Sequence, residues 1–144
     1  MTRALPATIA AALLCTVLTG CGPKDTEPAA APPTIKAAGT ITVDLPHFAW
    51  NPGEGCWGRE DHEQLRAGAT VTVHDNTGTT VGMGKLAEGT VTMQPDGEKA
   101  QNCTFAFEVG DVPAGRKFYS IEVVGEERVQ VSEGDLGRVR LRLG

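Results

Sequence analysis

The sequence predicts an all-β domain over residues 39–144, an antiparallel β-sandwich of about seven or eight strands with at most one short helix. Three observations favour this fold. Apolar and polar residues alternate with a period of two in many short segments, which is typical of strands with one buried face. Turn residues separate these segments at intervals typical of a sandwich. Helical periodicity is almost absent.

Eight segments carry the strand pattern, and the clearest is 103–109. Turns at 76–78 (Asn-Thr-Gly) and 95–97 (Pro-Asp-Gly) follow or precede several of them. In chain order, the apolar residues expected on the buried face are Ile41, Val43 and Leu45; Val71 and Val73; Val81 and Met83; Val91 and Met93; Cys103, Phe105, Phe107 and Val109; Tyr119, Ile121 and Val123; Val129 and Val131; and Val139, Leu141 and Leu143.

The best helix candidate is the short segment Asp61–Arg66. Asp61 is a suitable N-cap residue, and Gln64 stands where a capping box needs it. Gly68 would end the helix within about two turns.

The N-terminus has the layout of a secretory signal: Arg3 precedes a mostly apolar stretch from Ala4 to Gly20. Leu18-Thr19-Gly20-Cys21 resembles the lipobox of bacterial lipoproteins. This resemblance implies that residues 1–20 are removed as a signal peptide, that Cys21 carries lipid, and that the protein is anchored on the extracytoplasmic face of the cell membrane. An uncleaved membrane anchor is the second choice, because the apolar stretch is slightly short for a span.

Residues 21–38 are rich in Ala and Pro and hold one large apolar side chain, Ile35. This composition predicts a lipid-anchored, semi-rigid spacer with no core of its own. Removal of Arg3 leaves 12 basic and 18 acidic residues, so the mature chain has a charge near −6. That balance excludes the basic footprint of a nucleic-acid-binding protein.

Two stretches of the domain resemble known β-sandwich modules. The segment 68–78, and the run from Phe105 through the Pro113-Ala114-Gly115 turn to Val123, are similar to prealbumin-like and carboxypeptidase-regulatory-like domains. The resemblance implies an immunoglobulin-like or prealbumin-like sandwich and supports the fold alone. Residues 40–144 are also similar to small exported domains of actinobacterial lipoproteins, which have no assigned activity.

Cys56 and Cys103 are the two thiols left in the exported domain. Outside the membrane we expect them to form a disulfide. A redox pair or a zinc site is disfavoured, because the sequence has no Cys-x-x-Cys motif and no second pair of thiols.

Residues 46–59 form an aromatic loop that contains Phe48, Trp50 and Trp57. One interpretation is that these rings cap an open end of the sandwich. The other is that they form a ligand or partner patch, since long loops with their own aromatic residues are often functional. Capping is the favoured interpretation.

Arg138, Arg140 and Arg142 alternate with apolar residues in the last strand, so they should share one face. They could bind an acidic partner or an anionic wall polymer. The simpler interpretation is that they protect an edge strand from pairing with other chains.

Residues for catalysis or metal binding are few. His47, His62 and His74, with the acidic turn 60–63, lack any zinc-binding spacing. The Asp75-Asn76-Thr77-Gly78 segment lacks the later ligands of a calcium loop. The serines of the mature chain lie outside any nucleophile motif. We therefore predict no catalytic residues, no resident metal and no cofactor.

Two functional hypotheses follow. The first is a non-catalytic binding or structural module of the cell envelope, with an envelope protein or a cell-wall polymer as partner. The alternative is a metal-dependent or enzymatic protein that uses His47, His62, His74 and the turn 60–63. A small-solute receptor ranks last, since about 105 residues leave little interior for a solute.

Overall fold

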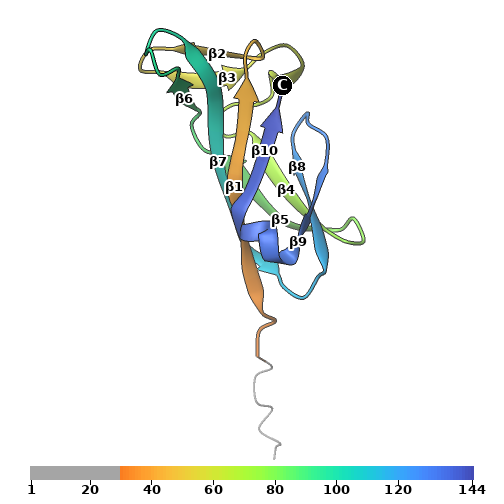
Figure 1. Cartoon of the computed structure of the whole chain (residues 1–144). Helices are drawn as coiled ribbons and strands as arrows, with labels where there is room; N and C mark the ends of the chain where they lie inside the picture. Colours follow the sequence, from red (N-terminus) through yellow and green to blue (C-terminus); the bar gives the residue numbers. More distant parts are fainter. Residues whose placement is uncertain (1–29) are drawn as a thin grey trace, which may run out of the picture. The chain divides into compact units, whose positions relative to one another are not determined.

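The computed structural model describes residues 30–144, and residues 31–144 form one compact unit. The predicted signal peptide and Cys21 lie outside the described residues. Most of the chain is strand, which confirms the all-β prediction (Figure 1). The ten strands are β1 (Thr34–Asp44), β2 (Phe48–Asn51), β3 (Gly55–Gly58), β4 (Thr70–Asp75), β5 (Thr80–Leu86), β6 (Thr90–Met93), β7 (Ala100–Pro113), β8 (Phe118–Val123), β9 (Val129–Ser132) and β10 (Val139–Leu143).

Eight strands form one sheet in the order β10-β1-β7-β5-β4-β8-β9, and β6 also pairs with β7. β2 and β3 form a separate two-stranded sheet. The pair β1–β10 is parallel and the others are antiparallel. The prediction of a purely antiparallel fold is therefore wrong for this pair. The predicted sandwich is not confirmed, because eight of the ten strands belong to one sheet. The last strand returns to lie beside the first after the whole domain has intervened, and a connection of that length permits parallel pairing.

β1 begins at Thr34, so residues 34–38 belong to the sheet although the sequence assigned them to the spacer. Ile35 lies opposite Val112 and Ala37 opposite Val109 on β7. Ala37 is fully buried and Ile35 packs against the core. The sequence did not predict this part of β1, because the segment has few apolar residues. The strand is stabilised by pairing with β7.

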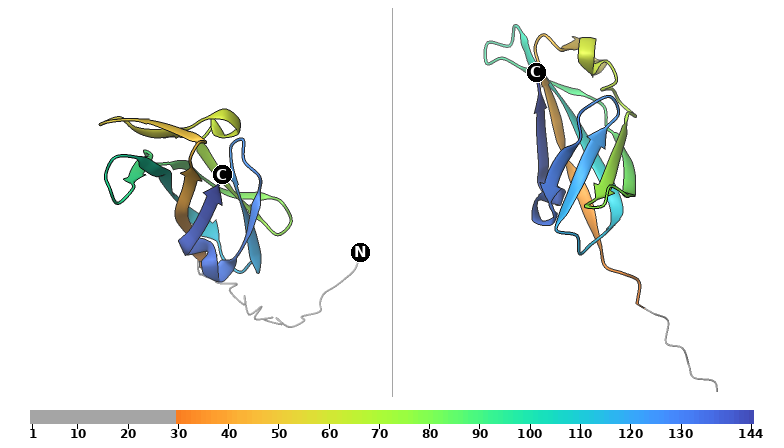
Figure 2. Two further views of the ribbon diagram at one scale, coloured as in Figure 1. Left: turned by 45° about the horizontal axis from the view of Figure 1, so that its top comes forward. Right: turned by 90° about the vertical axis from the view of Figure 1, so that its right-hand side faces the viewer.

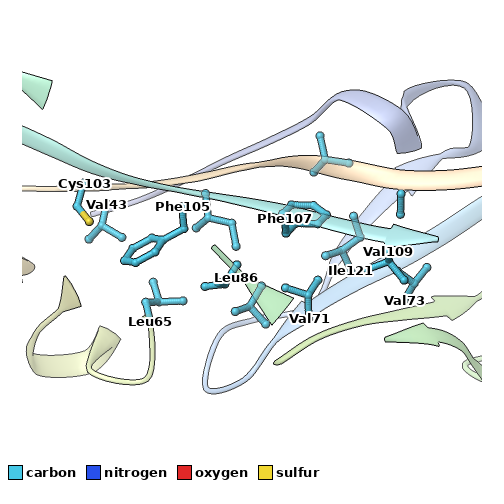
Figure 3. Close-up of a cluster of buried hydrophobic side chains, with 14 of the residues drawn as sticks. Val43, Leu65, Val71, Val73, Leu86, Cys103, Phe105, Phe107, Val109 and Ile121 are labelled. Atoms are coloured by element: carbon cyan, nitrogen blue, oxygen red, sulfur yellow. The ribbon is translucent and has the colours of Figure 1, made fainter. Parts of the chain in front are cut away.

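The large sheet is strongly curved (Figures 1 and 2), and its strands contribute most of the buried hydrophobic core. On β7 the predicted alternation is confirmed: Cys103, Phe105, Phe107 and Val109 are buried, and Glu108 is exposed. Figure 3 shows this row of side chains meeting residues of β4, β5 and β8. Those labelled there are Val43, Leu65, Val71, Val73, Leu86, Cys103, Phe105, Phe107, Val109 and Ile121.

β5 has the opposite phase from the one expected. Val81 was expected inside and is partly buried, and Met83 is 66% exposed. Gly82 and Gly84 face the core instead: a Cβ on either would lie 2.8 Å from a methyl group of Val109. Because the side-chain period of a strand is two, a shift of one residue exchanges its faces. The bulky residues of β7 thus leave room only for glycine.

Leu45 was also expected on the buried face and is 51% exposed. β1 ends one residue earlier, at Asp44, and Leu45 precedes Pro46 in the turn that follows. The residue before a proline often marks the end of a regular element, so the alternation stops before Leu45.

The predicted helix at 61–66 is reduced to one 3-10 turn, η1 (Glu60–His62), without a side-chain cap. Leu65 is drawn into the core, and its carbonyl accepts a 2.7 Å hydrogen bond from the Gly58 amide. These contacts end the helical path. A second 3-10 segment, η2 (Glu133–Arg138), was not expected and buries Leu136.

The turn after β4 is built on Asp75, whose side chain is buried. One of its oxygens accepts hydrogen bonds from the Thr77 hydroxyl (2.6 Å), the Thr77 amide (2.9 Å) and the Thr79 amide (3.0 Å). These hydrogen bonds, led by that of the Thr77 hydroxyl, hold the pKa of Asp75 below its usual value. The carboxylate thus closes a hairpin turn, as the sequence predicted.

A tyrosine fixes the opposite end of the sheet. The Tyr119 hydroxyl, on β8, donates a 2.6 Å hydrogen bond to the Pro113 carbonyl at the end of β7. The Glu133 carboxylate lies 3.2 Å from the same hydroxyl and accepts the Gly115 amide at 2.8 Å. Burial raises the pKa of Tyr119. The β7–β8 turn and the start of η2 are therefore held together by one phenol.

The predicted disulfide between Cys56 and Cys103 is present, with the two Cα atoms 6.0 Å apart. It joins β3 of the small sheet to β7 of the large one. Beside it, Cys56 pairs with Gly89 in an isolated β-bridge, and the Cys56 amide donates a 3.2 Å hydrogen bond to the Gly89 carbonyl. The disulfide is thus the covalent attachment of the β2–β3 hairpin.

Reduction of this disulfide should lower the free energy of unfolding by about 4 kcal/mol, because it releases a loop of 47 residues in the unfolded chain. Urea unfolding with and without dithiothreitol measures the change. A Cys56→Ala/Cys103→Ala variant is the control and should not respond to the reductant. Equal unfolding midpoints for the oxidised and reduced wild-type protein would contradict the prediction.

Candidate functional site

The aromatic loop 46–59 is a β-hairpin in the structure, formed by β2 and β3. It lies at the end of the domain opposite the beginning of β1, as both Figure 1 and the right-hand view of Figure 2 show. The hairpin and the first residue of β1 therefore lie at opposite ends of the described domain.

The two faces of the hairpin differ. Trp50 lies opposite Cys56, and Trp57 lies opposite Ala49. Cross-strand partners share a face and neighbours along a strand alternate, so Trp50 and Trp57 point to opposite faces. Phe48 is on the same face as Trp50.

The inner face caps the core. Phe48 is 3% exposed and belongs to the core, and Trp50 is partly buried and packs against it. The capping interpretation therefore describes these two rings. The prediction that Phe48 contacts a partner does not fit its burial, because its ring has no free surface to offer.

Trp57 lies outside the core cluster and is partly buried on the outer face. It lines a shallow groove of about 420 Å³ with Glu54, Arg66, Ala67 and Glu88. A second groove, of about 340 Å³, shares Trp57 and Arg66 with the first. Its other lining residues are Gly58, Arg59, Glu60 and Glu63.

A further groove of about 340 Å³ lies on the Trp50 side, between the hairpin and β6, and is lined by Trp50, Val91 and Met93 among others. Gly89 borders both this groove and the 420 Å³ groove. A Cβ at Gly89 would lie 2.5 Å from the Cys56 carbonyl oxygen and 2.7 Å from the Phe105 ring. Only glycine allows the chain to pass this close to Cys56 and Phe105.

Charged side chains around Trp57 are left without ionic partners. Arg59, Arg66, Glu63 and Glu88 take part in none of the ion pairs or side-chain hydrogen bonds found between residues 30 and 144. Elsewhere in that range, four arginines are paired. They are Arg116 with Asp75, Arg128 with Glu122, Arg138 with Asp135, and Arg142 with Asp44.

The histidines divide into two places. His47 and His62 meet edge to face, with ring centroids 5.5 Å apart. His47 Nδ1 lies 3.5 Å from Glu60, and His62 Nδ1 lies 2.9 Å from a carboxylate oxygen of Glu126. These contacts join the segment after the hairpin to the β8–β9 turn.

His74 belongs to a separate network on the sheet. Its Nε2 lies 3.1 Å from Glu122, and its Nδ1 lies 3.3 Å from the Thr80 hydroxyl. Glu122 also accepts two hydrogen bonds from Arg128, which are the main cause of its lowered pKa. In the described part of the chain, no three His, Cys, Asp or Glu side chains are grouped so that they could hold a metal ion.

The three arginines of the last segment do not form one free stripe. Arg138 ends η2 instead of joining the strand, and its guanidinium donates to Asp135 at 2.7 Å. Arg142 donates to both oxygens of Asp44, at 2.5 and 2.9 Å, and these bonds raise its pKa. Arg140 is exposed. β10 stands at the end of the sheet order, the position at which charged residues protect an edge.

The part of the chain described by the structure contains no helix with the length and apolarity needed to cross a membrane. No family model, curated protein or solved structure matches this sequence. The candidate site therefore rests on geometry and chemistry.

The two tryptophans should differ in their contribution to stability. Trp50→Ala should lower the free energy of unfolding by about 2 kcal/mol or more, because it removes a ring packed on the core. Trp57→Ala is the matched variant and should cost less than about 1 kcal/mol, as substitutions outside the core usually do. Urea unfolding followed by far-UV circular dichroism measures both. Equal losses would contradict the assignment of the two faces.

Proposed function

We propose that this protein is a lipid-anchored surface lipoprotein whose β-domain is a non-catalytic binding module of the cell envelope. The anchor is Cys21, and the binding face is the outer face of the β2–β3 hairpin. The lipobox resemblance supports the anchor. The observation that supports the binding face is the position of Trp57, outside the core and in the lining of two grooves.

Trp57 is only partly buried, and tryptophan is enriched among the residues that dominate binding energy. Trp50 has a structural role in capping the core. No such role is found for Trp57 among the described residues, because it lies on the opposite face of the hairpin. Binding accounts for the second ring.

The position of the hairpin supports the same proposal. The segment before β1 has the composition of a semi-rigid Ala/Pro spacer, and the hairpin lies at the other end of the domain. An anchor at Cys21 would thus present the Trp57 grooves away from the membrane, toward the wall or a neighbouring protein.

The metal-dependent or enzymatic alternative has less support. His47 and His62 lie together, but His74 belongs to a different network with Glu122 and Thr80. Each of the three histidines also has a structural neighbour of its own. The residues proposed for that activity therefore do not converge on one reaction centre.

The anchor predicts a specific lipid attachment. Cys21→Ser should abolish incorporation of a palmitate analogue fed to the cells and release the protein from the membrane fraction, because the acceptor sulfur is gone. Cys15→Ser is the matched control and should remain labelled, since Cys15 lies in the segment that is removed. Labelling that persists in Cys21→Ser would contradict the anchor.

The binding face predicts a position-dependent crosslink in intact cells. A photoreactive residue at Glu88, on the Trp57 groove, should give one dominant adduct, identified by mass spectrometry. The same residue at Met83, exposed on β5, should not give it. Combining the Glu88 probe with Trp57→Ala should lower the yield several-fold. The absence of an adduct, or equal adducts from both positions, would contradict this face.

A further inference from the structure

The grooves along Trp57 combine an apolar surface with ionic groups of both signs. The apolar part is the indole of Trp57 together with Ala67, and the rim carries carboxylates and guanidinium groups. The charged residues that line the two grooves are Glu54, Glu60, Glu63, Glu88, Arg59 and Arg66.

Most of these charges are available to a ligand. Arg59, Arg66, Glu63 and Glu88 have no ionic or hydrogen-bonded side-chain partner among residues 30–144. Of the seven arginines in that range, the four discussed above are held in ion pairs, and two of the remaining three line these grooves. Two of the three arginines without an ion pair in that range therefore lie beside one indole.

The sign of the charge limits the chemical classes of ligand that the grooves could bind. Four glutamates and two arginines give these grooves an excess of negative charge, and the mature chain is acidic as a whole. A polyanionic polymer would be repelled by both. A long apolar peptide would need a wider apolar surface than Trp57, Ala67, Cys56 and Gly89 supply.

An uncharged sugar ring matches this arrangement. One face of a pyranose presents C–H bonds that pack on an indole, and its edge carries hydroxyl groups that both donate and accept. Carboxylates accept from such hydroxyls and guanidinium groups donate to them, and hydrogen bonds with an ionised partner are the stronger kind. A groove of about 420 Å³ lies at the lower end of the range for small-ligand sites, as a binding site for one or two residues of a glycan would.

We infer that the Trp57 grooves bind a neutral saccharide of the cell surface, with a sugar ring stacked on Trp57 and its hydroxyls contacting Arg66 and Glu88. This inference rests on the proposed function and names the chemical class of its ligand.

Tryptophan fluorescence tests the inference in the full chain, purified in detergent. The chain has two tryptophans, so Trp50→Phe leaves Trp57 as the single reporter and Trp57→Phe leaves Trp50. The probes are a tetramer of β-1,4-linked N-acetylglucosamine and the neutral polysaccharide fraction of the cell's own wall. Dextran sulfate is the polyanionic control. We expect at least one neutral probe to shift the emission of Trp57 and to leave that of Trp50 unchanged.

Substitutions then locate the site. Trp57→Ala should weaken saccharide binding about tenfold or more, as the loss of a central aromatic contact does. Arg66→Gln and Glu88→Gln remove one ionic contact each from exposed positions and should each weaken it about threefold or more. Trp50→Phe should bind within about twofold of wild type. Thermal unfolding of each variant checks that it is folded, and the two rim variants keep the test valid if Trp57→Ala is unstable.

The outcomes separate this inference from the proposed function. Saccharide binding that requires Trp57 and the rim supports the inference. If neither neutral probe binds, or if all three substitutions bind like wild type, the inference is overturned. A protein adduct at Glu88 without saccharide binding overturns the saccharide and keeps the binding module. If there is neither a protein adduct at Glu88 nor saccharide binding, the inference and the proposed function are both overturned.

Discussion

The structure depends on the burial of one face of β7. This strand pairs with β1 along one edge and with β5 and β6 along the other, so its backbone is satisfied on both sides. Its inner side chains fill the middle of the core, and the fully buried Phe105 and Val109 dictate where neighbours need small residues. The glycine-lined inner face of β5 and the close passage of Gly89 are both consequences of the bulk on β7.

The same strand determines where the candidate site lies. Cys103 extends from the buried row of β7 and holds Cys56, so the β2–β3 hairpin is fastened across one end of the core. Because the inner face of the hairpin covers the core, Trp50 packs against core residues and Trp57 lies on the outer face. A covalent attachment made for stability thereby presents an aromatic ring beside a groove.

The distribution of ion pairs also distinguishes the hairpin end from the rest of the sheet. Ion pairs join Arg128 to Glu122 and Arg142 to Asp44. The Asp75 carboxylate accepts hydrogen bonds within its own turn. Exposed pairs of this kind contribute little to stability, but they leave few free charges over the sheet. Arg59 and Arg66 beside Trp57 take part in no ion pair among the described residues, and Arg140 of the last strand is likewise unpaired.

The sequence by itself determined the strand-rich class, the alternation along β7 and the pairing of Cys56 with Cys103. Period-two burial is a local property, and only two cysteines lie outside the N-terminal segment. Only the tertiary structure decided the parallel pairing of β10 with β1, the reversed phase of β5, and the different environments of Trp50 and Trp57. Each of these three features depends on which residues from a distant part of the chain pack against the segment. The residues next to a strand in sequence do not specify that surface. The two possible phases of β5 have the same local energy until Val109 of β7 packs against one of its faces.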